Sequence, residues 1–262
     1  MRLLASQPVS IAKILDTSIK LYVASFNKLI GFFLIMAAFY IATGLFTQQL
    51  IRGQTANPAE AQPAVLANLP LFWGFVLVFT LMSFVLYIAM VYRIDNVVNE
   101  REDSFMEALQ VGFKKFPSMI LAVFLYSIAM TVGLILLVVP GVILSLSLAF
   151  YLYFIVVDSL GGYAALKASH SLVWGNWWRT MTVFMAPFIV IMIIFMTVGL
   201  LIGFLGAVFI QNPASASILG IVNNIVSAFI TPYFFTLGYV QFNDLKLRKF
   251  GSDLAGRLSL EK

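Results

Sequence analysis

The sequence predicts an all-α membrane protein with six transmembrane helices as three hairpins, each preceded by a cytoplasmic amphipathic interfacial helix. Apolar residues make up 61% of the chain and charged residues 10%, with a mean hydropathy of +0.99. Soluble domains average about 45–50% apolar and 25% charged residues, so a water-soluble fold is excluded. Residues 118–157 carry no charge, and a stretch of that length is enough for two crossings of a hydrocarbon layer about 30 Å thick.

The first hairpin follows an amphipathic segment at residues 10–28. Its apolar and small residues recur at intervals of three and four, which predicts a helix in the plane of the membrane interface. We expect spans at 29–50 and 71–92. The segment 52–70 is rich in Ala, Gln, Asn and Pro and predicts an irregular loop. Charged residues crowd 93–103, so we expect that segment in water.

A second interfacial helix is expected at 104–116, before the uncharged stretch 118–157. Pro140 and Gly141 divide that stretch near its middle. Proline cannot donate the helical hydrogen bond and glycine tolerates positive φ, so residues 139–142 predict a tight turn between antiparallel spans. The alternative is a single kinked helix, which would overshoot the hydrocarbon about twofold.

A third amphipathic helix is expected at 162–174, followed by spans at 182–210 and 217–240. The remaining residues, 243–262, are polar and mixed in charge, and predict a cytoplasmic tail. The chain is therefore expected to form one polytopic membrane domain over residues 1–262.

The three interfacial segments share a pattern, which is a small or apolar residue, a leucine, and a small residue three positions after the leucine. The three occurrences are Ile14-Leu15 with Ser18, Ala108-Leu109 with Gly112, and Ala165-Leu166 with Ser169. This predicts parallel repeats at 10–92, 104–158 and 162–240. The alternative is that any interfacial helix produces such a pattern.

The distribution of positive charge predicts the orientation. With a cytoplasmic N-terminus, every lysine and arginine except Arg52 falls on the cytoplasmic side, so six spans with both termini inside are expected. The net charge of +5 then indicates anionic phospholipids as partners rather than nucleic acid. The headgroup-binding candidates are Lys13, Lys20, Lys114, Lys115 and Lys167.

No motif for catalysis, cofactor binding or metal binding is visible, and the chain contains no cysteine. None of the six predicted spans has a charged residue in its core, which weighs against a proton-coupled pump. Asn223 and Asn224 are the polar intramembrane candidates, and interhelical hydrogen bonding explains them as well as a substrate path does. Gly199, Gly203 and Ala207 form a row of small residues suited to helix packing, within the bundle or between protomers.

Several short motifs resemble a known family. They are 137–144 with Pro140-Gly141, 156–158 with Asp158, 165–169, 175–178 with Asn176 and Trp177, and Tyr239 followed by 243–249 with Asp244. Together they resemble the bacterial YciC / UPF0259 family and the related membrane domain of some glycerophosphoryl diester phosphodiesterases. The last motif looks like the Tyr-Asp-Leu-Arg ending of the phosphodiesterase group, with Lys246 where arginine is usual.

The resemblance implies a polytopic protein of the bacterial inner membrane with links to envelope lipids. Phosphodiesterase activity belongs to a separate soluble barrel, so it is not expected here. We expect a non-enzymatic protein that supports envelope or lipid homeostasis by binding lipid. The alternative is a transporter or lipid-translocating channel, which a polar cavity around Asn223 and Asn224 would favour.

Overall fold

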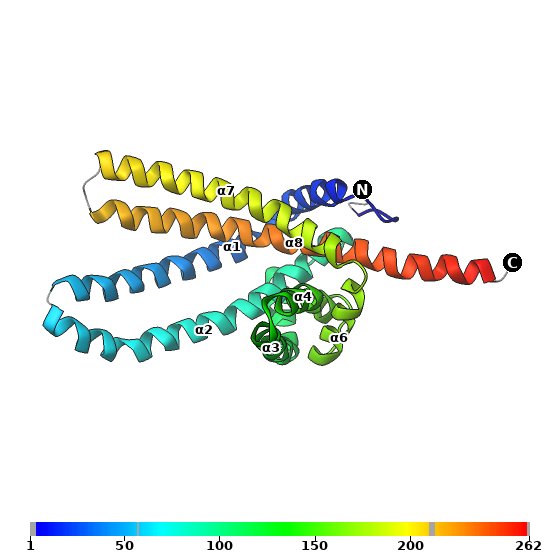
Figure 1. The fold of residues 1–262 in the computed structure, drawn as a ribbon, viewed down its shortest axis with the longest axis horizontal. Coiled ribbons are helices and arrows are strands. Elements are labelled where there is room, and N and C mark those ends of the chain that lie inside the picture. Colours follow the sequence, from blue (N-terminus) through cyan, green and yellow to red (C-terminus); the bar gives the residue numbers. More distant parts are fainter. Residues whose placement is uncertain (1–3, 57, 210–212, 261–262) are drawn as a thin grey trace. The chain divides into compact units, whose positions relative to one another are not determined.

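The computed structural model describes the backbone of residues 4–56, 58–209 and 213–260, and the side chains of residues 4–47, 68–137, 139–201, 204, 227 and 229–251. All of the regular secondary structure in these residues is helical (Figure 1). The helices are α1 (Ile11–Ala56), α2 (Pro58–Val98), α3 (Phe105–Leu136), α4 (Val138–Leu148), α5 (Tyr151–Val156), α6 (Gly162–Val173), α7 (Trp177–Phe209) and α8 (Pro213–Leu260). The predicted all-α class is confirmed for the described residues.

The chain divides into two compact units. The first comprises Met1–Leu29, Val85–Ile189 and Pro232–Lys262, and the second comprises Ile30–Phe84 and Val190–Thr231. Helices α1, α2, α7 and α8 each contribute one part to each unit, whereas α3 to α6 belong wholly to the first. The two units are described separately below.

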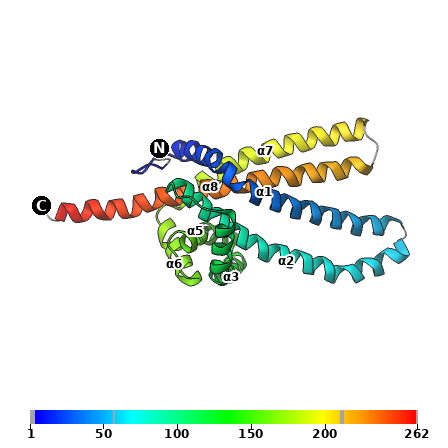
Figure 2. The same cartoon turned by 180° about the vertical axis from the view of Figure 1, so that it is seen from behind.

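In the second unit, the parts of α1 and α2 run side by side in opposite directions (Figure 2). Aromatic rings join them: Phe39 stacks on Phe79 at 4.9 Å between centroids, and Phe46 stacks on Phe72 at 5.6 Å. Phe33 of α1 also meets Phe229 of α8 edge to face at 5.7 Å. Offset and edge-to-face ring pairs are favourable beyond the area that they bury.

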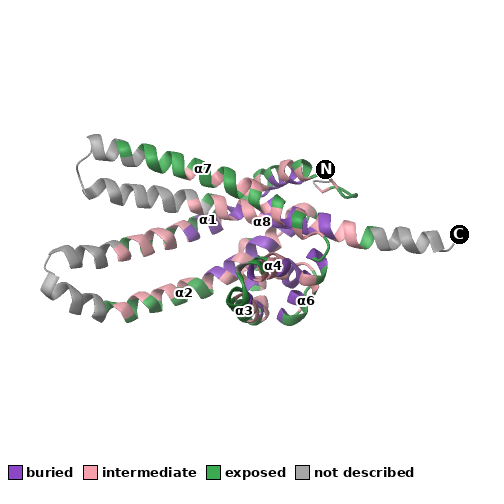
Figure 3. Ribbon diagram, viewed as in Figure 1, coloured by how far each residue is buried: buried purple, intermediate pink, exposed green. Residues whose placement is uncertain are grey.

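In the first unit, the core is built from the short helices, the middle of α8, and the parts of α1 and α2 that belong to this unit, where Ile14, Leu21 and residues 88–91 are fully buried. Buried positions, purple in Figure 3, gather on α5, on one side of α6 and on residues 236–242 of α8. Phe242 is its aromatic centre, because it stacks on Tyr153 at 5.6 Å and on Phe150 at 6.3 Å and meets Phe154 edge to face at 5.0 Å.

The first and last positions of the predicted repeat pattern are buried in all three segments, whereas Leu15 and Leu109 are only partly buried. Ile14, Ala108 and Ala165 are fully buried. One turn later, Ser18 and Ser169 are fully buried, and a Cβ on Gly112 would lie 2.7 Å from the carbonyl oxygen of Val85. The small residue therefore lies at a close contact each time. The repeats themselves stay a prediction.

Among the residues whose side chains are described, five helical segments are long and apolar enough to cross a membrane. They are Ile11–Thr47, Asn68–Val98, Phe105–Leu136, Val139–Val156 and Trp177–Leu201. The first two overlap the predicted spans 29–50 and 71–92, and the next two overlap the two halves of the uncharged stretch 118–157. The last contains most of the predicted span 182–210. The sixth predicted span, 217–240, lies in α8. The side chains of about half of its residues are not described, so a sixth span stays a prediction.

The prediction of an irregular loop at 52–70 is wrong. Helix α1 continues to Ala56, and α2 begins at Pro58. The alanine, glutamine and glutamate of this segment are good helix formers, and proline is well placed at the first position of a helix because its missing N–H would be unpaired there. Pro58 therefore marks a helix start, and Pro63 and Pro70 are tolerated within α2.

Two of the three predicted interfacial helices are continuous with the spans that follow them. Residues 10–28 belong to α1, and residues 104–116 belong to α3, which runs through Pro117. Ser104 caps α3 by accepting the N–H of Glu107 at 3.1 Å, and the helix continues through Pro117 into the predicted span. The third is a separate helix as predicted: α6 covers Gly162–Val173 and is followed by Gly175 at φ +90°. The predicted tail, 243–262, is helical to Leu260 as the end of α8.

The turn between α3 and α4 lies at Leu137, so its predicted position at 139–142 is wrong. Leu137 is extended, whereas Pro140 and Gly141 lie in the first turn of α4. Pro140 fits there because the first turn leaves its backbone N–H groups unpaired. Gly141 is needed for close packing instead, since a Cβ on it would lie 2.7 Å from a side-chain carbon of Leu134. Two packed helices therefore replace the single kinked helix.

Candidate functional site

A basic pocket of about 510 Å³ opens in the first unit beside the end of α2, the first half of α3 and the end of α5. Its cationic side chains are Arg101, Lys114 and Lys115, and its one carboxylate is Asp95. Hydroxyl groups of Tyr92, Ser118 and Ser159 also line it, beside the apolar side chains of Val111, Ile155, Val156, Val157 and Leu160. This combination of cations, hydroxyl groups and apolar walls is suited to an amphipathic anion.

Lys115 fixes one wall of the basic pocket. Its ammonium group donates to the carbonyl oxygens of Ile155 at 2.8 Å and Val156 at 3.0 Å, and to the hydroxyl of Ser159 at 2.9 Å. These are the unpaired acceptors at the end of α5, and a lysine at a helix C-terminus is favoured by the helix dipole. All three acceptors are neutral, so the hydrogen bonds hold the lysine in place without a counter-ion.

Asp95 and Arg101 form the wall at the end of α2. Asp95 is 8% exposed and accepts the hydroxyl of Tyr239 at 2.5 Å. Arg101 approaches the other carboxylate oxygen of Asp95 only to 3.5 Å, and its side chain is 62% exposed. One donor of the arginine therefore contacts Asp95, at a long distance.

Lys114 is exposed and makes no hydrogen bond or ion pair with any residue that the structure describes. Tyr92, near it in the basic pocket, donates its hydroxyl to Glu107 at 2.6 Å. Lys114 is therefore a cation of the basic pocket that is available to bind a ligand.

The charged segment 93–103 is not simply in water, as had been expected. The carboxylate of Asp103 is fully buried and accepts from Lys28 at 2.6 Å and from Arg93 at 2.8 Å. Arg93 also donates to the carbonyl oxygen of Lys28 at 2.6 Å. Arg93 and Asp103 therefore form tertiary contacts with Lys28 that hold α2 against α1.

A second polar cluster holds the N-terminal segment against α8. Asp244, 4% exposed, accepts the N–H of Val9 at 2.9 Å, Arg179 at 3.1 Å and Arg248 at 2.8 Å. Both arginines also donate to the carbonyl oxygen of Val9, Arg248 at 2.8 Å. The N–H and the carbonyl oxygen of Val9 are thereby both held, by one carboxylate and two guanidinium groups respectively.

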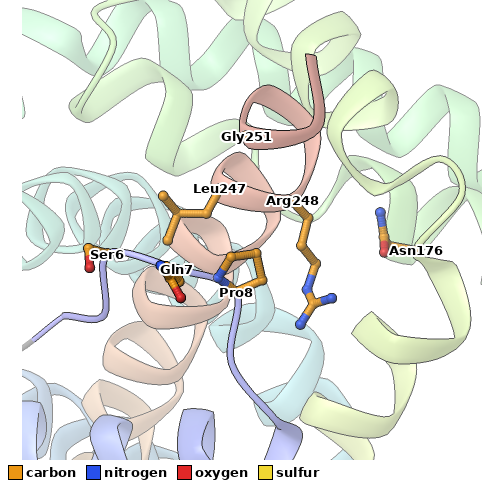
Figure 4. Close-up of a pocket in the computed structure, with 7 residues that line it drawn as sticks. All are labelled: Ser6, Gln7, Pro8, Asn176, Leu247, Arg248 and Gly251. Carbon is orange, nitrogen blue, oxygen red and sulfur yellow. The ribbon is translucent and has the colours of Figure 1, made fainter. Parts of the chain in front are cut away.

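A second pocket, of about 580 Å³, lies beside that cluster (Figure 4). Ser6, Gln7 and Pro8 line it from the N-terminal segment, and Leu247, Arg248 and Gly251 line it from α8, with Asn176 on the opposite side. Its one cation, Arg248, is already bound to Asp244 and Val9. The basic pocket is therefore the stronger candidate for an anion.

The predicted headgroup lysines fall into two groups. Lys114 and Lys115 line the basic pocket. The exposed residues Lys13, Lys20 and Lys167 lie outside it. Lys13 and Lys20 share Asp16 as a partner, at 3.3 Å and 2.9 Å.

The residues of the predicted structural motifs lie mostly in the first unit's framework. Asp158 accepts Lys246 at 2.6 and 2.8 Å, and the ammonium group of Lys246 also lies 4.5 Å from the ring centre of Phe242. Trp177 meets Trp178 edge to face at 4.7 Å. Among the described residues its indole N–H has no partner.

Other candidates are only partly described. The side chains of Asn223 and Asn224 lie outside the described residues, and so do Gly203 and Ala207 of the small-residue row. A Cβ on Gly199 would meet nothing within 4 Å. Among the described residues, no three histidine, aspartate or glutamate side chains are placed to hold a metal ion.

Sequence reasoning did not select Tyr92, Asp95 or Arg101. They lie in or beside a charged run that the sequence placed in water, and the pairing of Asp95 with Tyr239, 144 positions away, leaves no local pattern. One signal was present in the sequence. Asp95 lies about one turn after the end of the predicted span 71–92, and an aspartate that is buried needs a partner.

Comparison with known proteins identifies the family. The model of the Uncharacterised protein family (UPF0259) matches residues 54–240, more than half of the chain. This chain belongs to the UPF0259 family. It is 26% identical over 136 residues to a UPF0259 membrane protein of Photorhabdus laumondii. That match covers 51% of this chain and 50% of the relative, so the chain spans about half the length of the curated relative that it matches.

No solved structure matches the chain. The UPF0259 match confirms the family resemblance drawn from the motifs around Pro140, Asp158 and Asn176. The resemblance to the membrane domain of glycerophosphoryl diester phosphodiesterases stays a prediction. With five apolar helices long enough to span a bilayer, the UPF0259 chain has the build of a multi-pass membrane protein.

Proposed function

We propose that this UPF0259 protein is a non-enzymatic protein of the bacterial inner membrane that supports lipid homeostasis by binding anionic phospholipids on its cytoplasmic side. The observation that carries the proposal is the basic pocket, whose three cations face one carboxylate. The exposed lysines of α1 and α6 add to it.

The outward lysines lie opposite the buried faces of their helices. On α6, Ala165 and Ser169 are buried whereas Lys167 is exposed. On the first turns of α1, Ile14 is buried whereas Lys13 and Lys20 are exposed. Cations on the outer face of a juxtamembrane helix attract anionic headgroups by about 1 kcal/mol each, and salt screens this attraction. The contribution of Lys13 and Lys20 is reduced because they share Asp16.

The test compares the lipids that remain on the purified protein. A fourfold variant, Lys13→Gln, Lys20→Gln, Lys114→Gln and Lys167→Gln, is purified beside the wild type in a mild detergent. Lys115 is left in place because it holds the end of α5. We expect the fourfold variant to retain less phosphatidylglycerol and cardiolipin per protein, with phosphatidylethanolamine unchanged.

The matched control changes the same four lysines to arginine, which keeps the charge, and it should retain anionic lipid like the wild type. An unchanged melting temperature in all three proteins shows that the fold is intact. Equal anionic lipid in the glutamine variant and the wild type would contradict the proposed function.

The alternative, a transporter or lipid-translocating channel, has one observation in its favour. The predicted fourth span is broken into α4 and α5 around Ala149 and Phe150, and broken helices often mark the binding sites of transporters. Here, however, the freed N–H of Phe150 donates to Ser169 at 3.0 Å, so the break is packed. Movement of labelled lipid between the leaflets of reconstituted vesicles would favour this alternative.

A further inference from the structure

We infer that the basic pocket binds the phosphate of one anionic glycerophospholipid between Arg101 and Lys114, with the glycerol and first acyl carbons against its apolar wall. This inference rests on the proposed function, because it names the site through which lipid binding occurs. Three features of the pocket carry it: an unbalanced charge, a fixed wall and a mixed lining.

The charge of the basic pocket is unbalanced. Arg101, Lys114 and Lys115 supply three positive charges, and Asp95 supplies one negative charge. Asp95 is itself held by the hydroxyl of Tyr239 and so has a fixed position. Like charges gathered around a partly buried cavity repel one another, and an anion bound there would relieve this repulsion.

Lys115 is a positioning residue with an uncompensated charge. Its three donors are used by two backbone carbonyl groups and the hydroxyl of Ser159, so it does not need the ligand for hydrogen bonding. It nevertheless contributes a positive potential to the cavity and fixes the segment that carries Ser159. A wall that is built before binding lowers the entropic cost of holding a ligand.

Arg101 and Lys114 are the residues free to contact the ligand. Arg101 is 62% exposed and only 3.5 Å from its one carboxylate partner, and Lys114 has no partner among the described residues. A guanidinium group presents paired donors that match two phosphate oxygens, and a lysine adds a mobile point charge.

The apolar wall favours a lipid over a free phosphate. Val111, Val156 and Leu160 line the basic pocket beside the cations. The pocket, at about 510 Å³, has more room than one phosphate group needs, and it is within the range of small-molecule sites. A soluble phosphate would leave this apolar surface in contact with water, whereas glycerol and acyl carbons would cover it.

The test titrates the whole protein in detergent with short-chain dioctanoyl phosphatidylglycerol and follows binding by native mass spectrometry. The pocket variant is Arg101→Gln with Lys114→Gln, and the control is Ser127→Ala, which removes an exposed hydroxyl outside the pocket. We expect one saturable lipid on the wild type and the control. Because the pocket variant lacks two cations of the usual headgroup attraction, it should bind the lipid about 10- to 30-fold more weakly.

Two further arms separate the possible ligands. Dioctanoyl phosphatidylcholine, which carries the same phosphate but no net charge, should bind more weakly than phosphatidylglycerol to the wild type. Inorganic phosphate at millimolar concentration should compete only weakly. Equal affinity of the pocket variant and the wild type for phosphatidylglycerol would overturn the inference, and so would competition by phosphate at the concentration at which the lipid itself binds.

The two proposals fail in different ways. If the fourfold lysine variant loses anionic lipid while the pocket variant keeps its saturable lipid, the pocket is not the site although the protein binds lipid. If both variants keep all of their anionic lipid, the proposed function fails with the inference. The melting temperature of each variant is recorded, so that loss of binding is not confused with loss of the fold.

Discussion

The hydroxyl of Ser169 on α6 accepts the N–H of Phe150 at 3.0 Å and donates to the carbonyl oxygen of Ser147 at 2.9 Å. All three residues are fully buried. One side chain therefore satisfies both backbone groups that are freed where α4 ends and α5 begins. In a low-dielectric interior such groups are costly to leave unpaired, so Ser169 makes the break possible.

Replacing Ser169 with alanine should destabilise the protein by about 1–3 kcal/mol, because the N–H of Phe150 and the carbonyl of Ser147 lose their partner. The measurement is unfolding of the detergent-solubilised protein followed by circular dichroism. Ser127→Ala is the control, since the exposed hydroxyl of Ser127 bonds only within its own helix. Equal stability of the two variants would show that a water molecule or a backbone shift replaces Ser169.

The sequence predicted the elements that have local signals at both ends. Helix α6 is one, because Gly162 begins it and Gly175, at positive φ, follows it. The break at Leu137 was misplaced because Pro140 is acceptable in a first helical turn, so its presence does not distinguish a turn from a helix start. The break after Leu148 was not predicted, since it depends on Ser169, a residue on another helix.

The candidate site was predicted only in part. Lys114 and Lys115 were selected because lysines beside a span are recognisable in a sequence. Asp95 and Arg101 were not, because their roles depend on Tyr239 and on how α2 ends. A charged run looks the same in a sequence whether its charges face water or pair with distant residues, as the buried Asp103 shows.

Gly141 and Pro140 should differ sharply in their tolerance of substitution. A Cβ on Gly141 would lie 2.7 Å from a side-chain carbon of Leu134 and 3.2 Å from its backbone nitrogen, so Gly141→Leu should cost about 1–3 kcal/mol through overpacking. Pro140→Ala should have little effect, because the first turn of α4 needs no particular N–H there. Melting temperatures in detergent measure both. A larger loss for Pro140→Ala than for Gly141→Leu would restore the turn at 139–142.

Asp244 should be needed to hold the N-terminal segment. Asp244→Asn would leave Arg179 and Arg248 without their shared carboxylate, at a cost of about 3 kcal/mol for breaking a buried pair. The peptide group of Val9 would be held less firmly, so cleavage by a protease near the N-terminus should become faster. Asp16→Asn, which alters an exposed pair with Lys13 and Lys20, should lose much less stability. Protection of the N-terminus equal to the wild type would contradict this role of Asp244.

Three contacts within the first unit bear on the predicted six-span topology. Lys28 pairs with Asp103, Lys115 donates to the carbonyl of Val156, and Asp158 pairs with Lys246. Two residues in contact at a membrane surface lie on the same side, so the chain between them crosses the membrane an even number of times. Six spans are compatible with these contacts and stay a prediction. The three contacts enclose α1 with α2, α3 with α4 and α5, and α7 with α8.

The orientation that follows is testable with reporter fusions. Fusions after Glu102, Ser159 and Lys262 should report the cytoplasm, because the predicted six-span topology puts nearly all lysines and arginines on that side. Fusions after Pro58 and Asn212 should report the periplasm, since one helix of a hairpin has then crossed without its partner. A cytoplasmic signal at either of these two positions would remove the corresponding hairpin from the membrane. A periplasmic signal at residue 102 or 159 would place the basic pocket away from the cytoplasmic leaflet and contradict the orientation on which the proposed function rests.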